Sequence, residues 1–212
     1  MSTEAILLVM TVVTGMVDAV SFLSLGRVLT ANMTGNILLL GFAFAGTSGL
    51  SIMRSCAALL AFMTGALIGG RMTFGESGPR TARAFGSEGV LLLIAAAISF
   101  GLSESSALYP LIAVVGIAMG IRNAVVRKLA VPDLTTTVLT LTITGLVADS
   151  ALAGGLNPRW QRRCAAVLAM GGGALAGALM LRYSVALPLC VCAITAGGCS
   201  MAMFRVESRG GQ

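Results

Sequence analysis

The sequence predicts an all-α membrane protein with six spanning helices, two re-entrant or broken helical segments and two inverted repeats; eight full spans is the alternative. Three observations predict it: the composition, the distribution of basic residues and an internal similarity. Of 212 residues, 57% are hydrophobic and 10% are charged, whereas about a quarter of a soluble domain is charged. Because so few polar residues cannot cover a water-exposed surface, the composition excludes a soluble domain.

The chain contains eight long apolar segments, at 5–25, 28–47, 55–70, 89–102, 107–124, 134–152, 164–181 and 184–204. The second and the sixth carry several amides and hydroxyls where a lipid-facing helix would carry Leu and Ile. Each also contains glycine and ends in a turn-prone stretch, at 46–49 and 154–158. These two segments are therefore candidates for elements that do not cross the membrane.

The basic residues test whether those two segments cross, because each crossing changes the side on which the following Lys and Arg are counted. Eight spans divide the 14 basic residues 6 to 8, which gives no orientation. Six spans divide them 11 to 3, with Arg27, Arg54 and Arg182 on the minority side. Omitting Arg122, inside the edge of its helix, leaves 10 to 3. We therefore expect six spans and two cytoplasmic termini in a membrane protein of the inner-membrane type. We interpret the net charge of +6 as basic residues that anchor helices at the headgroups, so no nucleic-acid partner is expected.

An internal similarity divides the single expected domain, 1–212, into repeats at about 5–105 and 106–209. Residues 56–72 and 164–180 share 10 identities in 17 positions without a gap. A weaker match at a shift of 105 pairs Asp18 with Asn123. Three crossings per half put the halves in opposite orientations, so we expect the two broken segments to enter from opposite faces and to approach each other near the midplane.

Asp18 is an acidic residue well inside the first span, where a charge costs roughly 2.5–3.5 kcal/mol to insert. Thr11, Thr14, Asp18 and Ser21 are spaced 3, 4 and 3, which predicts one polar stripe on the helix. Asp18 then serves as a proton or cation relay or as a gate. The alternatives are a carboxylate that caps the broken second segment or that pairs with Arg122.

The two broken segments supply the other candidate binding residues. They are Asn32, Thr34 and Asn36 in the second segment, and Thr136, Thr137 and Thr140 in the sixth, with Asn123 as the counterpart of Asp18. Amides and hydroxyls at re-entrant tips line solute paths, but they also join helices by hydrogen bonds or bond back to their own helix. Both interpretations stay open here. Glycine pairs four residues apart, at 65 and 69, 116 and 120, and 173 and 177, predict close helix packing.

Catalytic and metal chemistry lack their usual residues. The chain has no histidine and no CxxC pair, and its five cysteines lie in apolar stretches. We expect these cysteines to be packing residues, and we expect no metal, no cofactor and no enzymatic activity. The amino terminus has no basic n-region, so no signal peptide is predicted.

Two stretches resemble the YoaK family of bacterial membrane proteins, a domain-of-unknown-function family. They are TGMVDAVSFLSLGRVLTANMTGN, which ends at Asn36, and MGIRNAVVRKLAVPDLTTTVLTLTITG, which begins at Met119. The likeness covers nearly the whole chain, and it departs at Arg122, where the family pattern has glutamine. The resemblance implies a bacterial inner-membrane protein of about this length and no established activity.

Two functions fit these expectations. The first is a small-solute transporter or channel with a polar midplane site and an unknown substrate. The second is a non-transporting membrane assembly or regulatory component, in which the same polar residues serve packing. The expected partners are the lipid bilayer and an unknown small solute, and a homo-oligomer is left open.

Overall fold

The computed structural model describes residues 2–74, 79–101, 103–131, 134, 136 and 139–210. The helices in this part of the chain are α1 (Thr3–Ser24), α2 (Met33–Phe44), α3 (Ile52–Met72), α4 (Arg80–Gly101), α5 (Glu104–Leu129), α6 (Thr140–Ala148), the 3-10 turn η1 (Ala151–Ala153), α7 (Trp160–Met180) and α8 (Ala186–Gly210). Within these ranges six helices are long and apolar enough to cross a membrane. The predicted all-α membrane fold with six spans is therefore confirmed.

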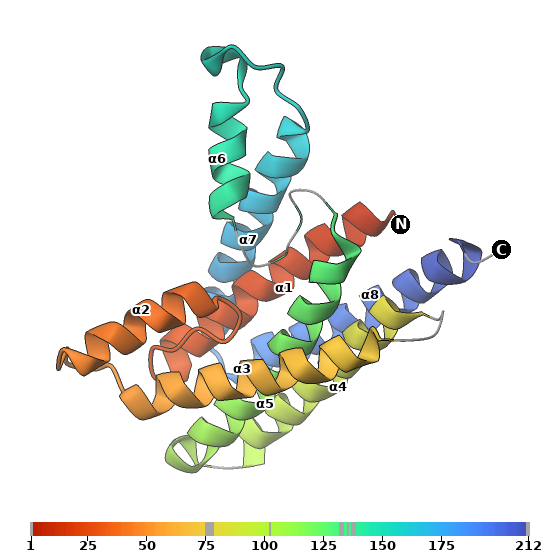
Figure 1. Cartoon of the computed structure of the whole chain (residues 1–212). Helices are drawn as coiled ribbons and strands as arrows, with labels where there is room; N and C mark the ends of the chain where they lie inside the picture. The colour runs from red at the N-terminus through yellow and green to blue at the C-terminus, as the bar shows by residue number, and fades with distance from the viewer. Residues whose placement is uncertain are drawn as a thin grey trace.

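The helices α2 and α6 occupy the two polar segments, and both are too short to cross. With 12 and 9 residues they extend about 18 and 14 Å at 1.5 Å per residue, against a hydrocarbon core about 30 Å thick. Each packs against the long helix that follows it, α2 on α3 and α6 on α7. Figure 1 shows α2 with the start of α3, and α6 with the start of α7, extending from the rest of the molecule as two separate arms.

Local caps define where the early helices begin. The side chain of Ser2 accepts a hydrogen bond from the amide of Ala5, and Asn32 does the same for Gly35 at the start of α2. Such caps satisfy backbone amides that a first helical turn leaves unpaired. Between α2 and α3 the chain reverses through Gly46 and Gly49, whose φ angles of 80° and 79° favour glycine.

The long helices pack in three pairs, α1 with α7, α3 with α5 and α4 with α8. Two of the seams are built on glycine. A Cβ atom on Gly15 would lie 2.1 Å from the carbonyl oxygen of Met170, and one on Gly120 would lie 2.2 Å from that of Phe62. The backbones therefore touch, and only glycine fits at these positions.

The same contacts recur in the two halves of the chain. Gly65 of α3 packs on Ile117 of α5, and Gly173 of α7 packs on Val12 of α1, in each case with 2.1 Å from the built Cβ to the carbonyl oxygen. The partners Val12 and Ile117 are 105 residues apart in the sequence. If α1 to α4 are taken as equivalent to α5 to α8, the contact of α2 with α3 corresponds to that of α6 with α7. The contact of α4 with α5 likewise corresponds to that of α8 with α1, and all four contacts are observed.

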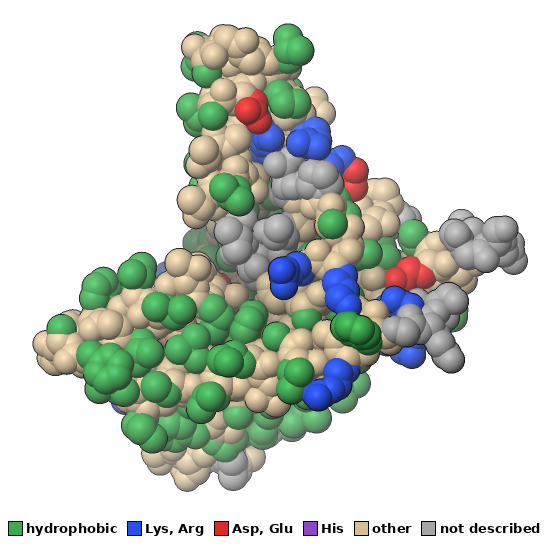
Figure 2. All heavy atoms as spheres, in the orientation of Figure 1, with side chains coloured by type: hydrophobic (Ala, Val, Ile, Leu, Met, Phe, Trp, Pro, Cys, Tyr) green, Lys and Arg blue, Asp and Glu red, His purple; other side chains and the backbone are tan. Residues whose placement is uncertain are grey.

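One end of the molecule collects the starts of α1, α4 and α7 and the ends of α3, α5 and α8. An ion pair joins Arg162 to Glu4, and Glu207 accepts hydrogen bonds from the amides of Thr81 and Ala82 at 3.0 and 3.1 Å. Figure 2 shows Lys and Arg side chains gathered over these helix ends, whereas the face over α2 and most of α3 is apolar. We call this the basic end; both termini lie on its side of the molecule (Figure 1).

Candidate functional site

A fully buried ion pair lies in the helical bundle. Arg122 of α5 donates from Nη1 to Oε1 of Glu88 on α4 at 3.0 Å, and both side chains are 0% exposed. The predicted boundary of the fourth segment, at Gly89, left Glu88 outside the membrane, and Arg122 was counted with the headgroup anchors. The structure corrects both expectations, because α4 begins at Arg80 and the Arg122 side chain points into the bundle.

Arg122 also binds α1 and its own helix. Its Nη1 donates to the carbonyl oxygen of Met10 at 3.1 Å, and its Nη2 contacts the hydroxyl of Thr14 at 2.7 Å and the sulfur of Met119 at 3.0 Å. Within the described residues, Oε2 of Glu88 and Nε of Arg122 have no hydrogen-bond partner. The pair is therefore held by three helices, yet it keeps one unused acceptor atom and one unused donor atom.

The pair lies within the length of two helices that could span a membrane. Arg122 precedes the end of α5 by seven residues, about 10 Å, and Glu88 follows the start of α4 by eight residues, about 12 Å. Charged side chains at such depth are costly and are characteristic of functional sites in membrane proteins. Since a buried ion pair rarely stabilises a protein more than apolar side chains of the same size would, stability alone does not account for it.

The polar stripe of α1 faces the bundle, as the spacing predicted. Thr11, Thr14, Asp18 and Ser21 are all buried. The three hydroxyls each donate to a carbonyl of their own helix, four residues earlier, at 2.8 to 3.0 Å. These hydroxyls are therefore satisfied without a solute.

Asp18 of α1 binds the linker that connects α1 to α2. Its Oδ1 accepts a hydrogen bond from the amide of Ala31 at 3.1 Å, at the entry to α2, where the helix dipole favours a negative charge. Beside it, the hydroxyls of Ser21 and Thr30 lie 2.6 Å apart. Of the alternatives for Asp18, the structure shows the carboxylate that caps the broken segment.

The second segment uses its amides to hold the arm together. Asn32 caps α2, Thr34 is exposed, and Asn36 is the buried residue of α2. The side chain of Asn36 accepts from the amide of Leu29 at 3.4 Å and donates to the carbonyl of Ser55 at 3.0 Å. It thereby joins the linker, α2 and α3.

Replacing Asn36 by Ala is expected to lower the free energy of unfolding by about 1–2 kcal/mol, because it removes the hydrogen bonds of Asn36 to a partly buried amide and to a buried helix carbonyl. Thr34→Ala, two residues away on an exposed position, is the matched control and is expected to change stability by less than about 0.5 kcal/mol. Far-UV circular dichroism during an SDS titration in mixed micelles measures both. Equal effects of the two substitutions would contradict the structural role of Asn36.

The predicted residues of the sixth segment are dispersed. Thr136 is buried with a φ of 61°, Thr140 is exposed at the start of α6, and Thr137 lies outside the described residues. Asn123 donates to the carbonyl of Met119 at 2.8 Å and lines a cavity of about 840 Å³. In the part of the chain that the structure describes, α2 packs on α3 and α6 packs on α7, so the two polar segments belong to different helix pairs (Figure 1). The single midplane site stays a prediction.

Glu88 is the residue that sequence reasoning missed, although a signal for it exists. Thr81, Phe85, Glu88, Leu92 and Ala95 are spaced 4, 3, 4 and 3 and are all buried. This spacing describes one face of a helix that continues before Gly89. Extending the apolar segment backwards along that face would have placed Glu88 inside the span.

The comparisons with known proteins agree with the resemblance of the two motifs. The family model described as "Protein of unknown function (DUF1275)" matches residues 6–202. The UPF0700 transmembrane protein YoaK of Bacillus subtilis (strain 168) is 33% identical over 153 residues, which are 70% of this chain and 67% of that protein. No solved structure matches the chain significantly. With six apolar helices and this relative, the chain is a multi-pass membrane protein that belongs to the DUF1275 family, and the predicted relation to YoaK is confirmed.

Proposed function

We propose that the protein is a secondary carrier of a small solute in a bacterial inner membrane, with both termini cytoplasmic. The observation that carries this proposal is the Glu88–Arg122 pair, which is fully buried between two candidate spanning helices and keeps an unused acceptor and donor. A carrier needs a polar centre that is sealed from both faces in one conformation and reached by water in others. The pair supplies such a centre, and Glu88 is the group that would take up a proton or release Arg122.

The recurrence of helix contacts supports a carrier over a fixed pore. Equivalent seams join α1 to α7 and α3 to α5, and α4 packs on α8. We interpret these contacts as two inverted repeats, an architecture in which one half rocks against the other around a fixed site. The break before α2 places non-helical backbone next to that movement, where it is tolerated because Val28, Thr30 and Ala31 are buried in protein.

Cys192 provides a native probe of the centre. It lies on α8, is fully buried, and its thiol is 4.0 Å from the carbonyl oxygen of Val13, on the helix that also carries Met10 and Thr14, the partners of Arg122. A variant that keeps Cys192 alone, with the other four cysteines replaced by Ser or Ala, would be reconstituted in vesicles. A charged, membrane-impermeant methanethiosulfonate reagent would then be applied from either side.

A carrier is expected to label slowly at Cys192 from each side, because the centre opens to the two faces in turn. Labelling after SDS denaturation gives the total amount of reactive thiol. Complete protection from both sides until denaturation would contradict the carrier and favour the assembly or regulatory component, in which the pair only joins helices. Fast labelling from both sides at once would indicate an open channel.

A further inference from the structure

The cavity beside Asn123 has the size and lining of a ligand site. Its volume of about 840 Å³ is within the range of roughly 300–1,000 Å³ of small-molecule pockets. It lies between α3 and the last turns of α5, at the basic end. Phe62, Ala66 and Leu134 give it an apolar wall, and Asn123, Arg127 and Lys128 give it a polar one.

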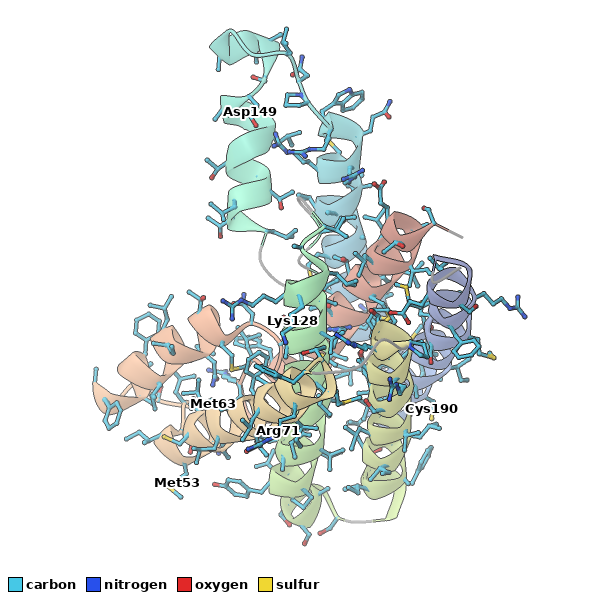
Figure 3. The ribbon with its side chains drawn as sticks, turned by 45° about the vertical axis from the view of Figure 1, so that its right-hand side comes forward. Met53, Met63, Arg71, Lys128, Asp149 and Cys190 are labelled. Carbon is cyan, nitrogen blue, oxygen red and sulfur yellow. The ribbon has the colours of Figure 1, made fainter. Side chains whose placement is uncertain are left out.

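The polar wall is positively charged. Arg127 and Lys128 both line the cavity, and its described lining contains no acidic residue. The ammonium of Lys128 lies 4.8 Å from the centre of the Phe74 ring, a cation–π contact that orders this side chain. Figure 3 shows Lys128 at the end of α5, next to the end of α3 that carries Arg71. A positive lining of this kind favours an anion.

The other half of the chain shows what fills the equivalent position there. Gly15 and Gly120 make equivalent seam contacts, which pairs Asp18 with Asn123. In the first half the Asp18 carboxylate supplies a negative charge and is buried under the linker. In the second half a neutral amide takes its place, half-buried and beside a cavity. The second half therefore has space and positive charge where the first half has its own carboxylate.

We propose that this cavity binds a small amphipathic carboxylate, with its anionic group at Arg127 and Lys128 and its apolar part against Phe62, Ala66 and Leu134. The ligand supplies the negative charge that Asp18 supplies in the first half. This inference rests on the proposed carrier function and names the substrate class. An anionic lipid headgroup with an acyl chain presents the same chemistry, so the test separates the two sources.

The test uses a single cysteine in place of Gly70, which lines the cavity and where a Cβ would meet nothing within 4 Å. With the five native cysteines replaced, the variant is reconstituted in phosphatidylcholine vesicles. The rate of modification is compared for a sulfonated and a trimethylammonium methanethiosulfonate of similar size. Replacing Lys128 by Gln is expected to lower the anionic-to-cationic rate ratio about tenfold. One charge about 6 Å away in water changes each rate about threefold, in opposite directions.

Occupancy is measured as protection of the same cysteine from an uncharged maleimide. Octanoate is expected to slow the reaction at least fivefold, whereas octanol at the same concentration does not. Asn123→Asp is expected to abolish protection, because it adds a negative charge to the wall. Protection only after phosphatidylglycerol is added to the vesicles would assign the site to a lipid headgroup of the same chemistry.

An unchanged rate ratio in Lys128→Gln, together with no protection by octanoate or by phosphatidylglycerol, would overturn the proposal. Arg127→Gln is the second variant; like Lys128, Arg127 is exposed, so neither substitution removes a packing contact from the core. Because labelling is scored without any flux, a protein that binds octanoate but keeps Cys192 protected would retain this site and lose the carrier function. A protein in which Cys192 is labelled from both sides but octanoate gives no protection would keep the carrier function and lose this site.

Discussion

Replacing Glu88 by Leu is expected to lower the free energy of unfolding by about 3–5 kcal/mol, because it leaves the Arg122 guanidinium buried without its counter-charge. Arg122→Met is expected to cost a similar amount, since it leaves the Glu88 carboxylate buried. The double variant Glu88→Leu with Arg122→Met should return to within about 1 kcal/mol of the native protein or exceed it, because an apolar pair of similar size needs no charge compensation. SDS-induced unfolding followed by far-UV circular dichroism measures all three.

The double variant also separates stability from function. If the pair is the centre of a carrier, the apolar version stays folded but admits no water, so labelling of Cys192 from either side is lost. A double variant as unstable as the single ones would show that the two substitutions act independently, which contradicts direct pairing. Single variants within about 1 kcal/mol of the native protein would show that water already solvates the charges.

Gly173→Ala is expected to cost about 3 kcal/mol, the upper part of the range for overpacked cores. The new Cβ would lie 2.1 Å from the backbone carbonyl oxygen of Val12, so α1 and α7 must separate. Gly172→Ala, one residue earlier, is the matched control, because a Cβ there meets nothing within 4 Å. It is expected to be neutral or to stabilise the helix by up to about 1 kcal/mol. The same unfolding titration compares them.

The counterpart of this substitution in the first repeat, Gly65→Ala, tests whether the two repeats are equivalent. Gly65→Ala places a Cβ 2.1 Å from the carbonyl oxygen of Ile117, so its cost should match that of Gly173→Ala within about 0.5 kcal/mol. A Gly173→Ala variant no less stable than Gly172→Ala would mean that the seam between α1 and α7 is looser than the structure shows.

The division into spanning and non-spanning segments could be read from residue types. The hydroxyls and amides before Gly35 and the threonines within residues 135–144 distinguish α2 and α6 from the six long helices, because lipid tolerates unsatisfied polar groups poorly. The distribution of Lys and Arg also indicates six spanning helices. These signals are local or additive along the chain, so no knowledge of tertiary contacts was needed.

The place of each polar side chain could not be read in the same way. Asn36 and Thr34 are two residues apart and similar in polarity, yet one joins α2 to α3 and the other is exposed. From the sequence, Asp18 is compatible with a relay or gate, with a cap of the second segment and with a pair with Arg122. The fold places the linker amide of Ala31 on its carboxylate. The position of each side chain depends on which neighbouring helix its own helix face contacts. Sequence periodicity identifies the buried face but does not identify that neighbouring helix.

The sequence by itself determined the class of the protein, the six spans, the polar stripe of α1 and the glycine pairs, because composition, hydropathy and side-chain size act through each residue and its near neighbours. Only the tertiary structure decided that Glu88 meets Arg122, since their side chains come from different helices and 34 positions separate them in the chain. It also decided that α2 and α6 lie on separate arms. Ion pairs and cavities arise from the packing of distant segments, so their place follows from the assembled bundle.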